Sequence, residues 1–129
     1  MSKYVFDTDV LINFFNKRTV ELELVAKFIQ ENRHLTISAL SLTELLTGWT
    51  NEQAARHLPK LTNGFHIQGV SVEIAALAGK LRRDYKSKGR LLPTVDTLIA
   101  ATALSLNATL VTNNTKDFPI PGLKLAPPA

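Results

Sequence analysis

The chain has 129 residues, 45% of them hydrophobic, and carries a net charge of +4 at pH 7; this length suits a single domain, 1–129, that buries about 65–70% of its unfolded surface. Cysteine is absent, which excludes disulfides and thiolate zinc sites and is typical of a reducing, cytoplasmic setting. Two acids interrupt the apolar N-terminal run at positions 7 and 9, so we expect neither a signal peptide nor a membrane span there.

Predicted strands and helices alternate along the first half of the chain. Residues 4–6 are an aromatic and β-branched run that suits a buried parallel strand, and a short helix is expected from residue 10. An amphipathic helix is predicted over residues 19–32, with an apolar face formed by Leu22, Val25, Ala26 and Ile29. A second strand over residues 34–38 precedes a helix around Leu45, and the capping box Thr50-x-x-Gln53 begins another helix.

The alternation continues in the second half. Residues 64–68 are a strand candidate, and helical spacing from Ile74 to Tyr85 predicts a long helix that ends at Gly89. Pro93-Thr94 opens a helix, 95–106, that is apolar almost all round and is therefore expected at the centre. A strand over 108–111, an edge strand over 123–125 and a frayed tail over 126–129 complete the chain. This order predicts an α/β fold: a parallel sheet with right-handed crossovers and helices on both faces.

Four acids lie where strands end or helices begin. Asp7 follows the first strand, Glu44 lies in the helix after the second strand, Asp96 lies in the first turn of the central helix, and Asp117 follows strand 108–111 by a short loop. In a parallel sheet these ends share one edge, which is where open α/β sheets bind their ligands.

Each acid also has a purely structural explanation. Asp7 or Asp9 suits an N-cap, Glu44 suits a capping box with Ser41, Asp96 complements a helix dipole, and Asp117 suits a turn. Four carboxylates gathered at one edge would nevertheless repel one another and take up protons unless cations were supplied. Oxygen ligands without cysteine or histidine favour Mg²⁺ or Mn²⁺.

The ordered set of motifs around these acids resembles the PIN domain family, most closely the VapC-type ribonuclease toxins of toxin–antitoxin pairs. The segments that carry the resemblance are Phe6-Asp7-Thr8-Asp9-Val10-Leu11-Ile12, Ile37-Ser38-x-x-Ser41-x-Thr43-Glu44-Leu45, Asp96-Thr97-Leu98-Ile99-Ala100-Ala101-Thr102-Ala103 and Leu110-Val111-Thr112-Asn113-Asn114-x-x-Asp117-Phe118. The resemblance spans nearly the whole chain and implies a PIN-like three-layer α/β/α fold with a short, mainly parallel central sheet.

The resemblance also implies an activity and its residues. Asp7, Glu44, Asp96 and Asp117 match the metal-site acids of a Mg²⁺- or Mn²⁺-dependent endoribonuclease, a hydrolase that cleaves RNA phosphodiester bonds. Supporting roles fall to Thr112 and Asn114 of the last motif and to Asp9. As partners it implies an RNA substrate, a VapB-type antitoxin that controls the toxin, and a second copy in a homodimer.

Substrate and partner surfaces are expected outside the motifs. A basic run leads to Asp96, and its members Lys86, Lys88 and Arg90 are candidates for binding phosphate, although a solvated helix end explains them as well. Residues 50–69 are expected to shape a substrate groove or dimer surface. An antitoxin requires an exposed apolar groove, which the helix Val20–Phe28 and the segment around Trp49 would line. The three histidines are expected on the surface or in packing.

Other classes of protein also place acids at a sheet edge. Phe6-Asp7-Thr8-Asp9 resembles the start of haloacid-dehalogenase-type phosphatases, with Asp7 as nucleophile and Asp9 as acid/base, but Val10-Leu11 replaces the expected Gly-Thr. A response-regulator receiver needs a phosphoacceptor aspartate at the end of a middle strand, and residues 35–38 supply none. A purely structural interaction module leaves Asp96 and Asp117 unexplained.

Overall fold

A five-stranded sheet in which all pairings are parallel forms the centre of the computed structural model, which describes residues 3–129. The strand order is β3-β2-β1-β4-β5. The strands are β1 (Lys3–Phe6), β2 (His34–Ser38), β3 (His66–Gln68), β4 (Thr109–Val111) and β5 (Lys124–Ala126). β1 therefore occupies the middle of the sheet, with β2 and β4 as its neighbours.

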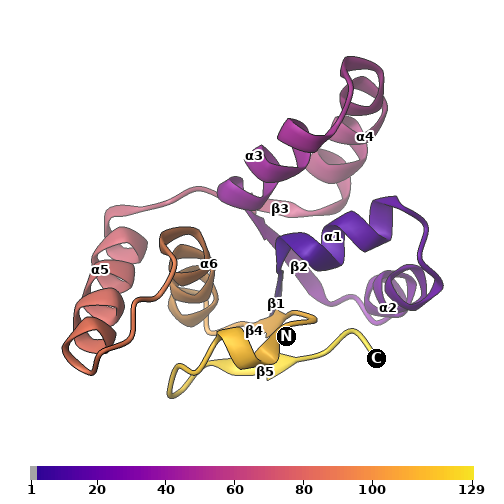
Figure 1. The fold of residues 1–129 in the computed structure, drawn as a ribbon. Coiled ribbons are helices and arrows are strands. Elements are labelled where there is room, and N and C mark those ends of the chain that lie inside the picture. Colours follow the sequence, from indigo (N-terminus) through magenta and orange to yellow (C-terminus); the bar gives the residue numbers. More distant parts are fainter. Residues whose placement is uncertain (1–2) are drawn as a thin grey trace.

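Helices cover both faces of this sheet. The helices are α1 (Thr8–Phe15), α2 (Thr19–Gln30), α3 (Ala39–Gly48), α4 (Asn51–Gly64), α5 (Val72–Ser87) and α6 (Thr94–Ser105), with a short 3₁₀ helix, η1 (Thr115–Asp117). In Figure 1, α1 to α4 lie on one side of the sheet and α5 and α6 on the other. The predicted three-layer α/β/α architecture is thus confirmed.

Alternation along β1 divides the core in two. Because successive side chains of a strand point to opposite faces, Phe6 packs with the core under α1 to α4, and Val5 packs with the core under α6. Both side chains are completely buried. The first core also contains Leu11 and Leu45, and the second contains Ile99. A strand buried on both faces explains why the sequence there is continuously apolar.

The predicted buried face of α2 is correct at Val25 and wrong at Leu22, Ala26 and Ile29. Leu22 and Ile29 are 39% and 59% exposed, whereas Val25 and Phe28 are buried together with Glu21. Glu21 accepts a hydrogen bond from Nδ2 of Asn13 on α1 at 3.0 Å. Because α2 carries apolar residues on more than one stripe, its contact with α1 decides which stripe is buried, and this contact is not a local property of the sequence.

Two further expectations need correction. The side chain that caps α3 is Ser38, which accepts from the backbone N–H of Leu40, so Glu44 and Ser41 do not form a capping box. The tail does not fray from residue 126, because Ala126 belongs to β5 and its carbonyl accepts a hydrogen bond from the N–H of Thr112. The capping box of Thr50 and Gln53 is present at the start of α4, as predicted.

The parallel arrangement sends every strand toward the same edge. The ends of β1, β2 and β4 lead directly into α1, α3 and the loop before η1. Among residues 3–129, no helix is both long enough and apolar enough to cross a membrane.

Candidate active site at the carboxyl edge of the sheet

Asp7 lies at the centre of this edge, where β1 ends and α1 begins. It is the N-cap of α1, is only 8% exposed, and accepts a hydrogen bond at Oδ1 from the N–H of Thr8 at 2.9 Å. Its Oδ2 accepts from the hydroxyl of Thr112 at 2.8 Å. Burial raises the pKa of Asp7, and the charge of Glu44 raises it further, although these two hydrogen bonds act in the opposite direction.

The loop after β4 extends this network to Asp9. The Thr112 hydroxyl accepts from the N–H of Asn114 at 3.0 Å, and Nδ2 of Asn114 donates to Oδ2 of Asp9 at 2.8 Å. Burial, followed by the charge of Asp7, raises the pKa of Asp9 to about 6. The other carboxylate oxygen of Asp9, Oδ1, is buried without a hydrogen-bond partner within residues 3–129. Asp9 therefore has a pKa at which it takes up a proton in mildly acidic solution.

Glu44 reaches the edge from α3 through contacts that the sequence analysis missed. Oε1 of Glu44 accepts from the Thr8 hydroxyl at 2.6 Å, and the same hydroxyl is hydrogen-bonded to Ser41 at 2.9 Å. Thr8 and Ser41 are both buried, whereas Glu44 is exposed. The signal available in the sequence was the polar Thr8 between two aspartates and the spacing Ser41-x-x-Glu44, which places both side chains on one face of a helix.

Asp96 and Asp117 complete the acidic group. Asp96 lies in the first turn of α6 and is half-buried, and Asp117 lies in η1 and is exposed. Burial raises the pKa of Asp96, and the charges of Asp7, Asp117 and Glu44 each raise it further. Asp96 and Asp117 also line a common groove of about 270 Å³. The structure thus places the four predicted acids close enough for the other three to raise the pKa of Asp96.

These four acids influence the pKa of Asp96 as a group, but their side chains are not arranged around a single metal position. Across residues 3–129, no three carboxylate or imidazole side chains are placed to bind one metal ion together. The two ion pairs in this part of the chain, Arg33 with Glu31 and Lys80 with Asp84, involve none of the four acids. The donor set still fits a hard divalent cation, because it offers only carboxylate oxygens, and at Asp7 and Asp96 the charged form is disfavoured until a cation is supplied.

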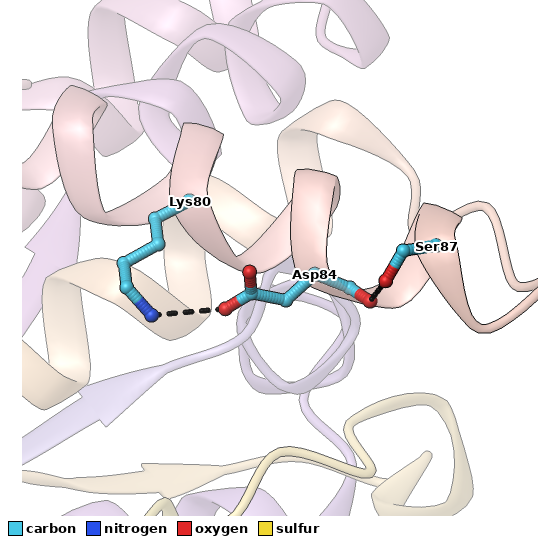
Figure 2. A network of polar contacts seen from close by, with 3 residues as sticks. All are labelled: Lys80, Asp84 and Ser87. Atoms are coloured by element: carbon cyan, nitrogen blue, oxygen red, sulfur yellow. Dashed lines mark hydrogen bonds and ion pairs between the residues drawn. The ribbon is translucent and has the colours of Figure 1, made fainter.

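Three cations of the basic run on and after α5 already have partners within the protein. Lys80 pairs with Asp84 at 2.9 Å, and the hydroxyl of Ser87 donates to the Asp84 carbonyl at 2.7 Å. Figure 2 shows these three side chains along α5. Nε of Arg82 donates to the carbonyl of Leu92, and the Lys88 ammonium lies 5.3 Å from the centre of the Tyr85 ring.

One member of the predicted phosphate-binding set lies beside the acids. Arg90 lines the same groove as Asp96 and Asp117. Lys86 and Lys88 are exposed, and both belong to the end of α5, where Lys86 is in the last turn and Lys88 is the C-cap. Arg90 is therefore the member of the predicted set that shares a groove with two of the four acids.

The histidines do not join the acidic group. His34 and His66 begin β2 and β3, and their rings lie 5.6 Å apart at the amino edge of the sheet. His57 packs against Phe15 and Trp49 in a pocket that also includes Glu44. This pocket lies between α1, α3 and α4, so residues 50–69 contribute α4 as one of its walls. Trp49 lines this pocket, and no residue of α2 does.

Comparisons with known proteins identify the family of this chain. The model of the PIN domain family matches residues 4–120. Ribonuclease VapC2 of Rickettsia felis is 35% identical over 131 aligned residues, which cover 95% of each chain.

Solved structures show the same fold. The R. felis complex VapBC2, bound to a DNA fragment from its promoter, contains a chain that superposes with a TM-score of 0.84 at 29% identity, covering 97% of this chain and 98% of that one. A toxin–antitoxin complex from Klebsiella pneumoniae superposes with a TM-score of 0.75 at 30% identity, covering 98% of both chains. The chain therefore belongs to the PIN domain family, and ribonuclease VapC2 of R. felis is one of its relatives.

Proposed function

We propose that this protein is a divalent-metal-dependent endoribonuclease and the toxin of a type II toxin–antitoxin pair. The observation that carries the proposal is the uncompensated acidic group of Asp7, Glu44, Asp96 and Asp117, in which burial and mutual repulsion raise the pKa of Asp7 and Asp96. The relatives named ribonuclease VapC support RNA as the substrate. The phosphatase alternative, with Asp7 as a nucleophile, receives no support from these relatives.

Within this proposal, the four acids hold Mg²⁺ or Mn²⁺. When bound, such an ion would polarise the scissile phosphate and lower the pKa of an attacking water molecule. Asp7 is the fixed ligand, because the Thr8 N–H and the Thr112 hydroxyl hold both of its oxygens in place. Glu44 and Asp117 are exposed and have room to rotate toward Asp7 and Asp96.

The remaining polar residues position this acidic group. Thr112 orients Asp7, and Asn114 connects Thr112 to Asp9 through its backbone and side chain. Such outer partners fix the direction of a metal ligand and typically alter metal affinity by about 10–100-fold when removed. On the substrate side, Arg90 contacts a phosphate next to the cut, with Lys86 and Lys88 extending the basic rim along the RNA backbone.

The antitoxin is a second protein that covers the site. The solved R. felis relative is the complex VapBC2, and the K. pneumoniae relative is a toxin–antitoxin complex. A cation from the antitoxin, best an arginine, would pair with the uncompensated acids and exclude metal and substrate. On α2, Val20, Leu22 and Ile29 remain exposed and offer apolar surface to such a partner. We also propose a homodimer as the active form.

Sequencing of RNA ends after a brief pulse of expression tests the nuclease. The wild type should generate new ends at defined positions, and Asp96→Asn should generate none. Asp84→Asn removes the same charge from α5, outside the acidic group, and should match the wild type. Identical ends from the wild type and Asp96→Asn would refute the assignment of the site. Cleavage by the purified protein that persists in excess EDTA would refute the metal dependence.

A further inference from the structure

The pocket between α1, α3 and α4 combines aromatic rings with positive charge. Its volume is about 610 Å³, which lies within the range of sites that bind small organic groups, about 300–1,000 Å³. The rings of Phe15, Trp49 and His57 form its aromatic part, with centroids 5.0 Å apart for Phe15 and Trp49, 4.8 Å for Phe15 and His57, and 4.9 Å for Trp49 and His57. Phe15 belongs to α1, Trp49 is the C-cap of α3 and His57 belongs to α4, so packing of these three helices brings the rings together.

Three cations surround the rings. Lys17, Arg56 and Lys60 line the pocket, and Glu44 is its only acidic lining residue within the described chain. Burial lowers the pKa of His57, and the charges of Arg56, Lys60 and Lys17 lower it further, so the ring is neutral near pH 7. Its Nδ1 is buried and lacks a hydrogen-bond partner within residues 3–129. A neutral imidazole has one donor and one acceptor nitrogen, a pattern that the edge of a nucleobase can match.

We propose that this pocket is a nucleotide subsite that binds one unpaired base of the RNA next to the cleavage site. The base lies against the ring cluster, and Lys17, Arg56 and Lys60 hold the phosphates on either side of it. Single-stranded nucleic acid is bound elsewhere by the same combination of aromatic faces and a basic groove. The inference rests on the proposed ribonuclease function, and it adds the path that the RNA strand takes from the acidic group to this pocket.

Glu44 provides the connection between the pocket and the proposed chemistry. It lines the pocket and also accepts a hydrogen bond from Thr8, whose backbone N–H is bonded to Asp7. When a base of the RNA occupies the pocket, a neighbouring phosphate of the same strand therefore lies at the acidic group. An acidic peptide would satisfy the cations equally well, but it has no need of the three aromatic rings that lie between those cations. These features together favour RNA over a protein ligand.

Trp49 is the only tryptophan in the chain, so its fluorescence reports on this pocket alone. The probe is a short oligouridylate titrated into the full-length protein in EDTA, where metal-dependent cleavage is blocked. Binding is followed by the anisotropy of a label on the RNA and, separately, by Trp49 emission. An abasic oligomer of the same length supplies the phosphates without the bases. We expect both oligomers to bind, and only the oligouridylate to quench Trp49.

Charge variants test the phosphate contacts. Arg56→Ala with Lys60→Ala removes two exposed cations of the pocket, so the fold should persist. If each contacts a phosphate, the slope of log affinity against log salt should fall by about 1.4 for single-stranded RNA. The control is Lys3→Ala with Lys124→Ala, which removes the same charge from the amino ends of β1 and β5. Its slope should stay close to that of the wild type.

The outcomes separate this inference from the proposed function. Metal-dependent cleavage together with RNA binding that leaves Trp49 emission unchanged would overturn the subsite and leave the nuclease in place. Equal salt slopes for the pocket variant and its control would overturn the phosphate contacts. If an acidic peptide quenched Trp49 and the oligouridylate did not, the pocket would belong to a protein partner. Absence of any RNA binding or cleavage would overturn both proposals.

Discussion

The hydroxyl of Thr112 donates to Oδ2 of Asp7 at 2.8 Å, and this bond joins residues 105 positions apart in the sequence. It connects the end of β4 with the end of β1, which are neighbouring parallel strands. Both residues are buried. A carboxylate held this way keeps one orientation even though burial raises its pKa. We therefore propose that Thr112 positions Asp7, and removal of its hydroxyl gives the first prediction.

Thr112→Val preserves the shape of the side chain and removes the donor. We expect the free energy of unfolding to fall by about 1–3 kcal/mol, because a buried acceptor loses its partner. Stabilisation by Mg²⁺ should also weaken, by about 10–100-fold in apparent affinity. Urea titrations with and without Mg²⁺ measure both effects.

Thr102→Val is the matched control for this change. Thr102 is also buried, but its hydroxyl donates to the carbonyl of Leu98 within α6 rather than to a carboxylate. This variant should lose little stability and should respond to Mg²⁺ like the wild type. An equal loss of Mg²⁺ response in both variants would show that Thr112 has no specific role at the site.

Asp96→Asn should separate activity from stability. Cleavage should fall at least about a hundredfold, because the change removes one of the proposed metal ligands. The metal-free domain should be as stable as the wild type or more so, since the change relieves repulsion from Asp7, Asp117 and Glu44. Thermal unfolding in EDTA and single-turnover cleavage measure the two quantities. Asp84→Asn should lower neither activity nor Mg²⁺ response.

The pKa shifts predict an unusual pH dependence of the metal-free protein. Asp7, Asp9 and Asp96 all have a pKa raised on folding, to about 6 for Asp9. The folded state therefore binds more protons than the unfolded state between about pH 6 and the ordinary aspartate value of 3.8. Stability contributed by these groups is complete below that value and is lost as the pH rises through the folded pKa.

Thermal unfolding in EDTA should accordingly give a higher midpoint at pH 5.5 than at pH 7.5. Asp9→Asn should reduce this difference, because it removes the group with the pKa of about 6. Mg²⁺ should raise the midpoint more at pH 7.5 than at pH 5.5, since it competes with protons for the acids. A midpoint that falls steadily on acidification from pH 7.5 would contradict the raised pKa values of Asp7, Asp9 and Asp96.

Much of this arrangement was accessible from the sequence. Strand and helix order followed from apolar runs and spacing, and parallel order then placed the ends of β1, β2 and β4 at one edge. The positions of Asp7 and Asp96 at helix starts were local properties. The bond from Thr8 to Glu44 was not, because it joins residues 36 apart whose side chains meet only after α1 and α3 pack.

The errors have the same cause. The apolar face of α2 was assigned from spacing, but packing against α1 buries Glu21 and leaves Leu22 exposed. The tail was expected to fray, but the edge of β4 supplies a partner for Ala126. In both cases a tertiary contact decides between two locally acceptable structures.

Arg90 and Lys80 give opposite predictions for RNA binding. Arg90 lines the groove with Asp96 and Asp117, whereas Lys80 is paired with Asp84 on α5. Arg90→Ala should therefore weaken binding of a short single-stranded RNA and reduce the salt slope by about 0.7, the value for one lost phosphate contact. Lys80→Ala should leave the slope unchanged. Fluorescence anisotropy across a salt series measures both, and equal slopes would return Arg90 to the role of a solvated loop residue.

The last prediction concerns the antitoxin and the charge at the site. Within residues 3–129, neither ion pair involves Asp7, Glu44, Asp96 or Asp117. A partner that inserts an arginine beside these acids would lower the raised pKa of Asp7 and Asp96 and occupy the place of a metal ion. We therefore expect co-expression with the adjacent antitoxin gene to yield a stable complex that does not cleave RNA. In the complex, the rise in stability between pH 7.5 and pH 5.5 should disappear, because the acids are then paired with a cation rather than with protons. Asp7→Asn with Asp96→Asn should weaken the complex, whereas Asp84→Asn should not. A chain that purifies alone from its native operon, and that is harmless when overexpressed, would count against the toxin assignment.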